Sequence, residues 1–144
     1  MLTIKTYLDR STVHGIGLFA GEQIPAGRVI WVFNPAVDLE FSLEQWQELR
    51  RKISAPSFAS LVRHSYKEDD RVYLCLDNAQ FMNHDPEKDN IRQDPTDNTM
   101  HAMRDIAPGE ELFCNYFDYS DPDDIHLRRL SRSAAPVRQG QPNP

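Results

Sequence analysis

The stretch Gly109-Glu-Glu-Leu-Phe-Cys-Asn-Tyr116 decides the fold of this chain. The glycine marks a tight turn, and the residues from Leu112 to Tyr116 are typical of a short strand that a tyrosine ends. A tyrosine at the end of a strand is more often a core aromatic residue with a solvated hydroxyl than a reactive group. By itself this stretch predicts a β-rich fold and leaves the function open.

The turn in this stretch has a counterpart near the N-terminus. The sequence Gln23-Ile-Pro-Ala-Gly-Arg-Val-Ile30 is similar to Asp105-Ile-Ala-Pro-Gly-Glu-Glu-Leu112, because each places an apolar residue before a Pro/Gly turn and a strand. Two copies are too few for a repeat array, which needs more units at regular intervals. The pair therefore predicts a β architecture that folds over on itself at two corners.

The rest of the chain is expected to be mainly β (α+β), with one helical insertion. Further short strands are expected at residues 2–7, 17–20, 29–33, 72–76, 90–93 and 99–103. Ser42 and Gln45 form a capping box before apolar residues at helical spacing, which predicts a helix that ends at Pro56. A second helix over 57–64 and a charged loop over 67–71 would follow, so that the insertion covers about residues 42–64.

Length and composition predict one domain followed by an extension. The chain has 144 residues, and 40% of them are hydrophobic, which suffices for a single core. We expect this domain to cover residues 1–120. Residues 121–144 would form a C-terminal extension, with a short helix near 125–130 and then a tail rich in Pro, Gln and Arg that we expect to be disordered.

Charge and cysteine content narrow the partners and the compartment. The net charge of -6 disfavours a direct nucleic-acid partner and favours a basic one. Cys75 and Cys114 lack the spacing of a zinc cluster or a disulfide framework, which predicts a reducing compartment. Charged residues interrupt the first ten positions, and no stretch reaches membrane-spanning length, so we expect a soluble cytoplasmic protein without membrane contact.

Two further motifs carry glycines or polar groups. Gly15-Ile16-Gly17 allows a sharp turn or a close approach of backbone to a ligand, but it lacks the third glycine of a dinucleotide fingerprint. Asn83 and His84 follow two large apolar residues, so they are expected at the rim of the core with hydrogen-bond partners there. A turn-forming asparagine and histidine would explain the pair equally well. The aspartates nearby do not match a calcium loop, so no metal is predicted.

Taken together and in order, these motifs resemble the SET domain of protein-lysine methyltransferases. The order is a GxG turn, a strand and Pro-Ala-Gly, then Phe-x-Asn-His in midchain, then Ile-x-Pro-Gly-Glu-Glu-Leu leading to Asn-Tyr. The resemblance runs from about Ile4 to Tyr119 and is closest to minimal members of bacterial or viral type. It implies a β-clip of several small sheets with a pseudoknot-like crossing, where the segment bearing Asn83 and His84 passes beside the strand that ends in Tyr116.

The resemblance also implies an activity, namely transfer of a methyl group from S-adenosylmethionine to the side-chain amine of lysine in a basic protein. Tyr116 would be the catalytic residue. The implied cofactor-binding residues are His14, Gly15, Ile16, Gly17, Gln80, Asn83 and His84. The implied lysine channel is lined by Phe33, Met82, Cys114, Phe117 and Tyr119. Such a reaction needs alignment and the exclusion of water rather than a metal, and an apolar channel lowers the pKa of the lysine.

Three positions depart from the family pattern. Gln80 stands where many members have an arginine that contacts the cofactor carboxylate. Cys114 stands where members usually have Phe or Tyr, and Phe33 stands in place of another channel tyrosine. Because neither position has a phenol, fewer hydrogen bonds would hold the amine and more room would be left, which predicts a di- or trimethyl product. The zinc modules of many eukaryotic members are absent, so Phe117, Tyr119 and the segment to Leu130 would complete the channel. A second copy in a homodimer could complete it instead, and we leave monomer and homodimer open.

Two alternatives remain at this stage. A non-catalytic β-clip module that binds a peptide or a sugar shares the Ile-Pro-Ala-Gly corner, but it does not require Asn83-His84 or Asn115-Tyr116. A SET fold that has lost turnover and only binds a partner is consistent with Gln80 and Cys114.

Overall fold

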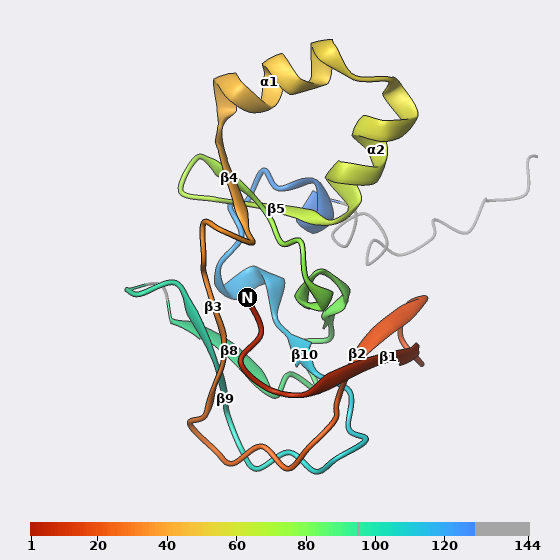
Figure 1. Cartoon of the computed structure of the whole chain (residues 1–144), viewed down its shortest axis with the longest axis vertical. Coiled ribbons are helices and arrows are strands. Elements are labelled where there is room, and N and C mark those ends of the chain that lie inside the picture. Colours follow the sequence, from red (N-terminus) through yellow and green to blue (C-terminus); the bar gives the residue numbers. More distant parts are fainter. Residues whose placement is uncertain (95, 129–144) are drawn as a thin grey trace, which may run out of the picture.

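The computed structural model describes residues 1–94 and 96–128 (Figure 1). In chain order the elements are β1 (Thr6–Arg10), β2 (Ile16–Ala20), β3 (Val29–Val32), β4 (Leu39–Ser42), α1 (Leu43–Lys52), α2 (Ala55–Arg63), β5 (Ser65–Glu68), β6 (Arg71–Leu74), the 3-10 helix η1 (Asn78–Phe81), β7 (Asn83–His84), β8 (Ile91–Asp94), β9 (Thr99–Ala102), β10 (Phe113–Cys114) and the 3-10 helix η2 (Tyr116–Asp118). The strands form sheets of two (β1-β2), five (β3-β9-β8-β10-β7) and three (β4-β6-β5) members. The prediction of a mainly β chain with several small sheets and a helical insertion is confirmed.

The two Pro/Gly corners pack against each other, as predicted. Ile24 and Ile106 form an antiparallel bridge in which each N–H donates to the other's carbonyl, at 3.0 and 2.8 Å. Both side chains are buried. Gly27 and Gly109 adopt positive φ, and each donates its N–H over 2.8 Å to the strand that leads into the other corner. The chain is therefore folded over with its two corners side by side, at the bottom of the view in Figure 1.

The helical insertion begins as predicted and divides at a different place. The Ser42 side chain accepts a hydrogen bond from the Gln45 N–H, and the Gln45 side chain accepts one from the Ser42 N–H. The first helix ends at Lys52, and the second begins at Ala55, so the prediction that Pro56 ends the first helix was wrong. Pro56 lies in the first turn of α2, where an N–H has no intrahelical acceptor and proline is tolerated.

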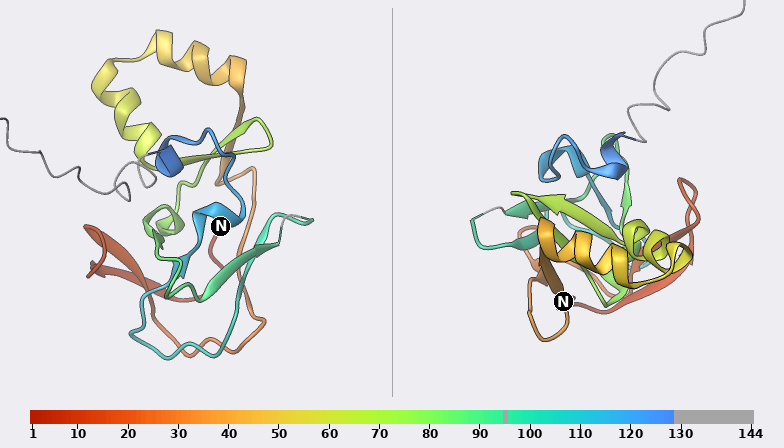
Figure 2. Two further views of the ribbon diagram at one scale, coloured as in Figure 1. Left: turned by 180° about the vertical axis from the view of Figure 1, so that it is seen from behind. Right: turned by 90° about the horizontal axis from the view of Figure 1, so that it is seen from above.

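The charged loop expected over residues 67–71 is instead the tip of a hairpin between β5 and β6. Tyr66 pairs with Tyr73 and Lys67 with Val72 in this antiparallel ladder. Asp69 and Asp70 make the turn in the left-handed region, with φ of 49° and 55°. Figure 2 shows the two helices and this three-stranded sheet together at one end of the molecule.

A crossing of the chain brings distant segments together. Strand β10 lies between β7 and β8, which are consecutive in sequence, and it runs parallel to both. Buried Asn90 fastens this crossing: its Nδ2 donates to the Glu111 carbonyl, and its Oδ1 accepts from the Phe113 N–H, both at 2.9 Å. The predicted pseudoknot-like crossing is present, because the segment bearing Asn83 and His84 pairs directly with the strand that leads to Tyr116.

The described chain ends in a segment that packs beside α2 and β5. Residues 125–128 are helical, and Leu127 is buried. The remainder of the helix expected near 125–130, and the tail to residue 144, lie outside the described residues. Within residues 1–94 and 96–128, no helix is long and apolar enough to cross a membrane.

Candidate active site

Asn83 ties the GxG loop to the crossing. Its Nδ2 atom lies 3.1 Å from the carbonyl oxygens of His14 and Ile16, and also 3.1 Å from Oε1 of Glu111. Asn83 is paired with β10 through the parallel ladder, so one side chain joins three segments that are far apart in sequence. The structure thus brings the GxG loop and the Asn-His pair side by side.

The two glycines of the loop are required for different reasons. Gly15 adopts a φ of 55°, a conformation that residues other than glycine rarely adopt. Gly17 is buried against Glu111, because a Cβ at this position would lie 2.0 Å from the Glu111 Oε1 atom. The carboxylate therefore occupies the space that a side chain at position 17 would need. This explains the spacing of the motif without reference to any ligand.

Tyr116 is held at both its backbone and its hydroxyl. Its hydroxyl donates to the Met82 carbonyl at 2.8 Å, and its N–H donates to Nδ1 of His84 at 3.1 Å. Burial raises the pKa of the Tyr116 phenol well above its usual range, so it stays protonated. Burial also lowers the pKa of His84, which keeps its Nδ1 lone pair available to accept. The result is a neutral phenol whose proton is already engaged and whose oxygen can still accept a hydrogen bond.

An aromatic cluster extends from Tyr116 toward the three-stranded sheet. We use this name for Phe33, Tyr66, Tyr73, Tyr116 and Tyr119. Tyr119 lies edge-on to Tyr116 at 6.1 Å and to Tyr66 at 5.3 Å, and Tyr66 stacks on Tyr73 at 5.2 Å. Phe33 contacts only the outer end of the cluster, edge-on to Tyr73 at 5.8 Å. Sequence analysis missed Tyr66 and Tyr73, whose strands it had not placed in one hairpin.

Buried polar groups lie in and beside this cluster. The Cys114 sulfur lies 3.5 Å from the Tyr119 hydroxyl, and burial raises the pKa of the Cys114 thiol to about 12. The Tyr66 hydroxyl is buried and has no hydrogen-bond partner among the described residues. A buried hydroxyl without a partner is costly and marks a place where a ligand group or a water belongs. The cluster therefore combines apolar walls with one unsatisfied donor.

The remaining predicted residues lie at the edges of this arrangement. Met82 contributes its carbonyl oxygen to Tyr116, while its side chain is buried in the core. Phe117 is 52% exposed and packs edge-on against His84 at 5.2 Å. Gln80 lies in η1 and donates its side-chain amide to the Asp77 carbonyl, so this nitrogen serves the local 3-10 turn. Met82 therefore contacts Tyr116, and Phe117 contacts His84. In the hydrogen bonds of the described residues, Gln80 is joined to Asp77 and not to Tyr116 or His84.

The C-terminal segment is fastened beside the aromatic cluster by hydrogen bonds. Buried Asp124 accepts from the Lys67 N–H at 2.8 Å, and Nε2 of His126 lies 3.0 Å from the Val62 carbonyl and 2.9 Å from that of Ser65. The His126 ring also meets Tyr116 edge-on at 6.3 Å. Sequence analysis did not identify these anchors.

A groove of about 340 Å³ opens between the helical insertion and the C-terminal segment. Its lining combines apolar and aromatic residues, such as Trp46, Phe58 and Tyr66, with two acidic and two basic residues, Asp123, Asp124, Arg50 and Lys67. Because Tyr66 belongs to both, the groove adjoins the aromatic cluster.

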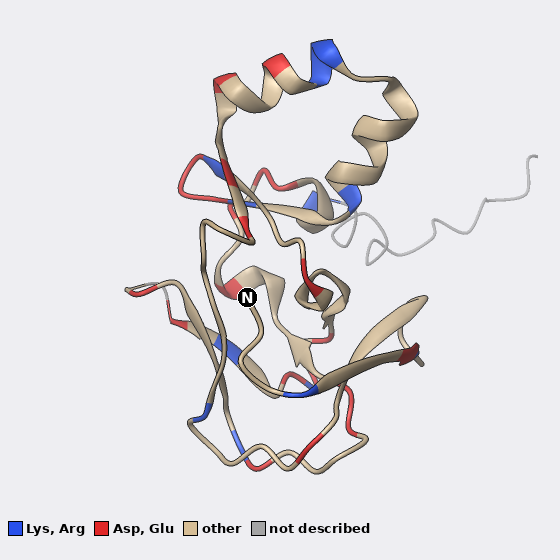
Figure 3. Cartoon of the chain, viewed as in Figure 1, with Lys and Arg blue, Asp and Glu red and all other residues tan. Residues whose placement is uncertain are grey.

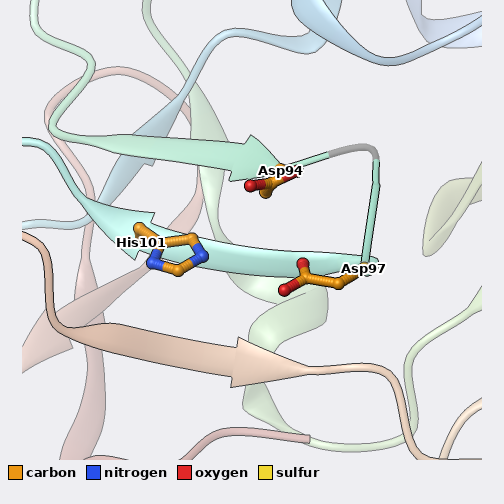
Figure 4. A group of neighbouring side chains, drawn as sticks. All are labelled: Asp94, Asp97 and His101. Carbon is orange, nitrogen blue, oxygen red and sulfur yellow. The ribbon is translucent and has the colours of Figure 1, made fainter.

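One group of side chains could hold a cation by its residue types. The ligand atoms of Asp94, Asp97 and His101 lie within 4.8 Å of one another at the β8–β9 hairpin (Figure 4). The Thr99 hydroxyl contacts both Asp97 and the Nε2 atom of His101, and Thr96 donates to Asp94. These hydrogen bonds within the hairpin explain why the three side chains lie together, without any bound cation.

A strand passed between two consecutive strands, with a GxG loop tied to an Asn-His pair, is the arrangement of the SET-domain fold. The chain belongs to the SET domain family, whose profile matches residues 15–117. No curated protein matches the chain.

Solved structures support this fold. A Plasmodium falciparum protein named as a histone methyltransferase is 22% identical, with a TM-score of 0.52 over 80% of this chain and 95% of that one. Chaetomium thermophilum Polycomb Repressive Complex 2 bound to S-adenosylmethionine is 20% identical, with a TM-score of 0.58 over 90% of this chain and 17% of that one. A crystal structure of the same complex is also 20% identical, with a TM-score of 0.58 and coverage of 85% and 16%. This chain therefore spans only about a sixth of the Polycomb chains, and at these identities the likeness shows the fold.

Proposed function

We propose that this chain transfers methyl groups from S-adenosylmethionine to the side-chain amine of lysine in a protein substrate. Family membership supports the reaction class. The observation that carries the proposal is the placement of Tyr116, a buried neutral phenol held by the Met82 carbonyl and by His84, between the Asn-His pair and the aromatic cluster. The Asn-His pair suits the cofactor, and the other rings of the aromatic cluster suit the lysine side chain.

The surface beside Asn83 and His84 fits the proposed cofactor. Ile16 and Phe117 are each 52% exposed and lie on either side of the Asn-His pair. The Ile16 carbonyl accepts from Asn83, and the Phe117 ring packs against that of His84. An adenosine requires apolar surface with a few polar groups for orientation, and this surface offers both. The residues that would hold the cofactor are the backbone of His14 to Gly17 together with Asn83 and His84. When bound, the cofactor supplies a methyl group on a sulfonium, which is already activated for transfer.

Tyr116 would act by position and charge distribution. Because burial raises its pKa, loss of its proton is disfavoured, and it is a poor base. Its hydroxyl donates a hydrogen bond to the Met82 carbonyl, and this directs the lone pairs of the phenol oxygen away from that carbonyl. Such an oxygen stabilises positive charge near the reacting atoms and fixes the line of attack.

The aromatic cluster would form the lysine channel. Its apolar walls disfavour the charged form of the amine, which lowers the pKa of the entering lysine and favours its deprotonation. The unpartnered Tyr66 hydroxyl is the group with which the amine, or a water beside it, would form a hydrogen bond. Cys114 occupies less space than an aromatic residue, and this supports the proposal of a di- or trimethyl product.

The carboxylates that surround Lys67, at the edge of the groove, support a basic protein as the substrate. Lys67 lies within 3.1 Å of three carboxylates, those of Asp70, Asp121 and Asp123, so its own charge is more than balanced. Figure 3 shows acidic residues along the loops beside the three-stranded sheet and basic residues near the ends of α1 and α2. A lysine-rich segment would be attracted to the excess negative charge of these carboxylates. We propose the same cytoplasmic setting that the sequence favours, with either a monomer or a homodimer as the active form.

A transfer assay tests the proposal. Methyl-labelled S-adenosylmethionine is incubated with the protein and with basic protein mixtures, and labelled lysines are identified by mass spectrometry. The proposal predicts label on lysine with the wild-type chain and at least ~10-fold less with Tyr116→Phe, whose cofactor affinity should be unchanged. Cofactor binding without any transfer would identify a SET fold that only binds. Absence of cofactor binding would contradict the proposal altogether.

A further inference from the structure

Glu111 is a half-buried carboxylate beside the GxG loop. Its Oε1 atom accepts from Asn83 Nδ2 at 3.1 Å and faces the Cα of Gly17. Its neighbour Glu110 pairs with Arg104 at 2.8 Å. Within residues 1–94 and 96–128, no cationic side chain forms an ion pair with Glu111.

A partly buried carboxylate without a cation is costly, because hydrogen bonds from neutral groups replace only part of its hydration. The hydrogen bonds in the structure satisfy Oε1, whereas no hydrogen bond from a described residue reaches Oε2. This atom therefore remains available to a positive group that enters beside Asn83.

We propose that Glu111 binds the α-ammonium group of S-adenosylmethionine. The inference rests on the proposed function, since Asn83 and the GxG loop are the residues assigned there to the cofactor. The amino-acid end of this cofactor carries one ammonium and one carboxylate group. Gln80 offers no positive charge for the carboxylate, and its side-chain nitrogen is engaged by Asp77, so recognition of the amino-acid end falls more heavily on its ammonium group.

A purely structural role for Glu111 makes a different prediction. If the carboxylate only holds Asn83 and leaves room at Gly17, its charge is irrelevant, and any loss of binding affects every ligand of the site equally. If it binds an ammonium group, the loss is confined to ligands that carry one. Glu111→Gln separates the two roles, because the amide keeps an oxygen that accepts from Asn83 and removes the charge.

Isothermal titration calorimetry on the full chain tests the inference with three ligands. These are S-adenosylmethionine, S-adenosylhomocysteine and 5′-methylthioadenosine, which lacks the amino-acid end. Glu111→Gln should weaken the first two by about 10-fold or more, as expected for a hydrogen-bonded charge pair, and the third by less than about 2-fold. Glu110→Gln is the matched control and should leave all three affinities unchanged.

The outcomes separate this inference from the proposed function. If the wild-type chain binds none of the three ligands, the proposed function fails, and the inference fails with it. If the wild-type chain binds them and Glu111→Gln binds them equally well, or is weakened equally for all three, only the inference is overturned. A measurement without any variant guards against a folding defect: the wild-type chain should bind S-adenosylhomocysteine about 10-fold tighter than its deaminated analogue. Equal affinities would also overturn the inference.

Discussion

Replacement of Asn90 should destabilise the protein strongly, because its buried side chain fastens the crossing of the chain. The side chain is 2% exposed and satisfies two backbone groups of the crossing, the Glu111 carbonyl and the Phe113 N–H, each at 2.9 Å. Leaving a buried backbone group unpaired costs about 1–3 kcal/mol. Two such groups give an expected loss of about 2–6 kcal/mol in the free energy of unfolding for Asn90→Ala or Asn90→Leu.

The assay for Asn90 is urea unfolding, with the loss computed from the shift in midpoint and the slope of the transition. Asn90→Leu keeps the number and branching of the side-chain heavy atoms and leaves no cavity, so it separates the loss of the hydrogen bonds from the cavity that Asn90→Ala leaves. Asn78→Ala, at an exposed position in η1, is the matched control and should change stability by less than about 0.5 kcal/mol. A loss below about 1 kcal/mol for Asn90→Leu would refute the view that this residue fastens the crossing.

Four further results are expected. Tyr116→Phe should lower the free energy of unfolding by about 1 kcal/mol and Tm by about 3 °C, measured by calorimetry, because one buried hydrogen bond is lost. Gly17→Ala should weaken cofactor binding at least about 10-fold in titration calorimetry, because the added methyl group displaces the Glu111 carboxylate. Gly15→Ala should lower the free energy of unfolding by about 1 kcal/mol, because alanine is strained at the positive φ of this position. Burial lowers the pKa of His84 in the folded chain below that in the unfolded chain, so protonation of His84 favours unfolding. Its contribution to stability is therefore present above the unfolded pKa and is lost as the pH falls below about 6.5. Urea midpoints measured from about pH 7.5 to about pH 5 should fall less steeply for His84→Asn than for the wild-type chain. Cys114→Tyr should shift the product from di- or trimethyl-lysine to monomethyl-lysine, and mass spectra that show only monomethyl-lysine for the wild-type chain would contradict this view of the channel.

The two corners and the start of the first helix could be predicted from the sequence because local backbone geometry requires their residues. Gly27 and Gly109 have positive φ at the two corners, and Ser42 caps a helix through its own side chain. These requirements involve residues that are close in sequence, so a single sequence reveals them. The resemblance then supplied the crossing, which no local pattern predicts.

The features that sequence analysis missed depend on distant contacts. Strand β7 has two residues and exists because it pairs with β10, so it has no hydrophobic period of its own. The strand expected from Leu112 to Tyr116 is shorter in the structure, where β10 covers only Phe113–Cys114 and Tyr116 begins η2. Strand β5 carries charged residues that mask its pairing with β6, and Tyr66 therefore passed unnoticed. Asn90 was expected to begin a strand, and its role in fastening the crossing depends on β10, which lies beside it only in the folded chain.

The central claim is that the crossing places Tyr116 between a cofactor surface at Asn83 and His84 and a lysine channel in the aromatic cluster. A crystal structure of the chain with S-adenosylhomocysteine tests it most directly. The account predicts density for the ligand along the GxG loop and the Asn-His pair, with its sulfur directed toward the Tyr116 hydroxyl. Ligand density elsewhere on the molecule, or a Tyr116 ring turned away from the sulfur, would contradict it.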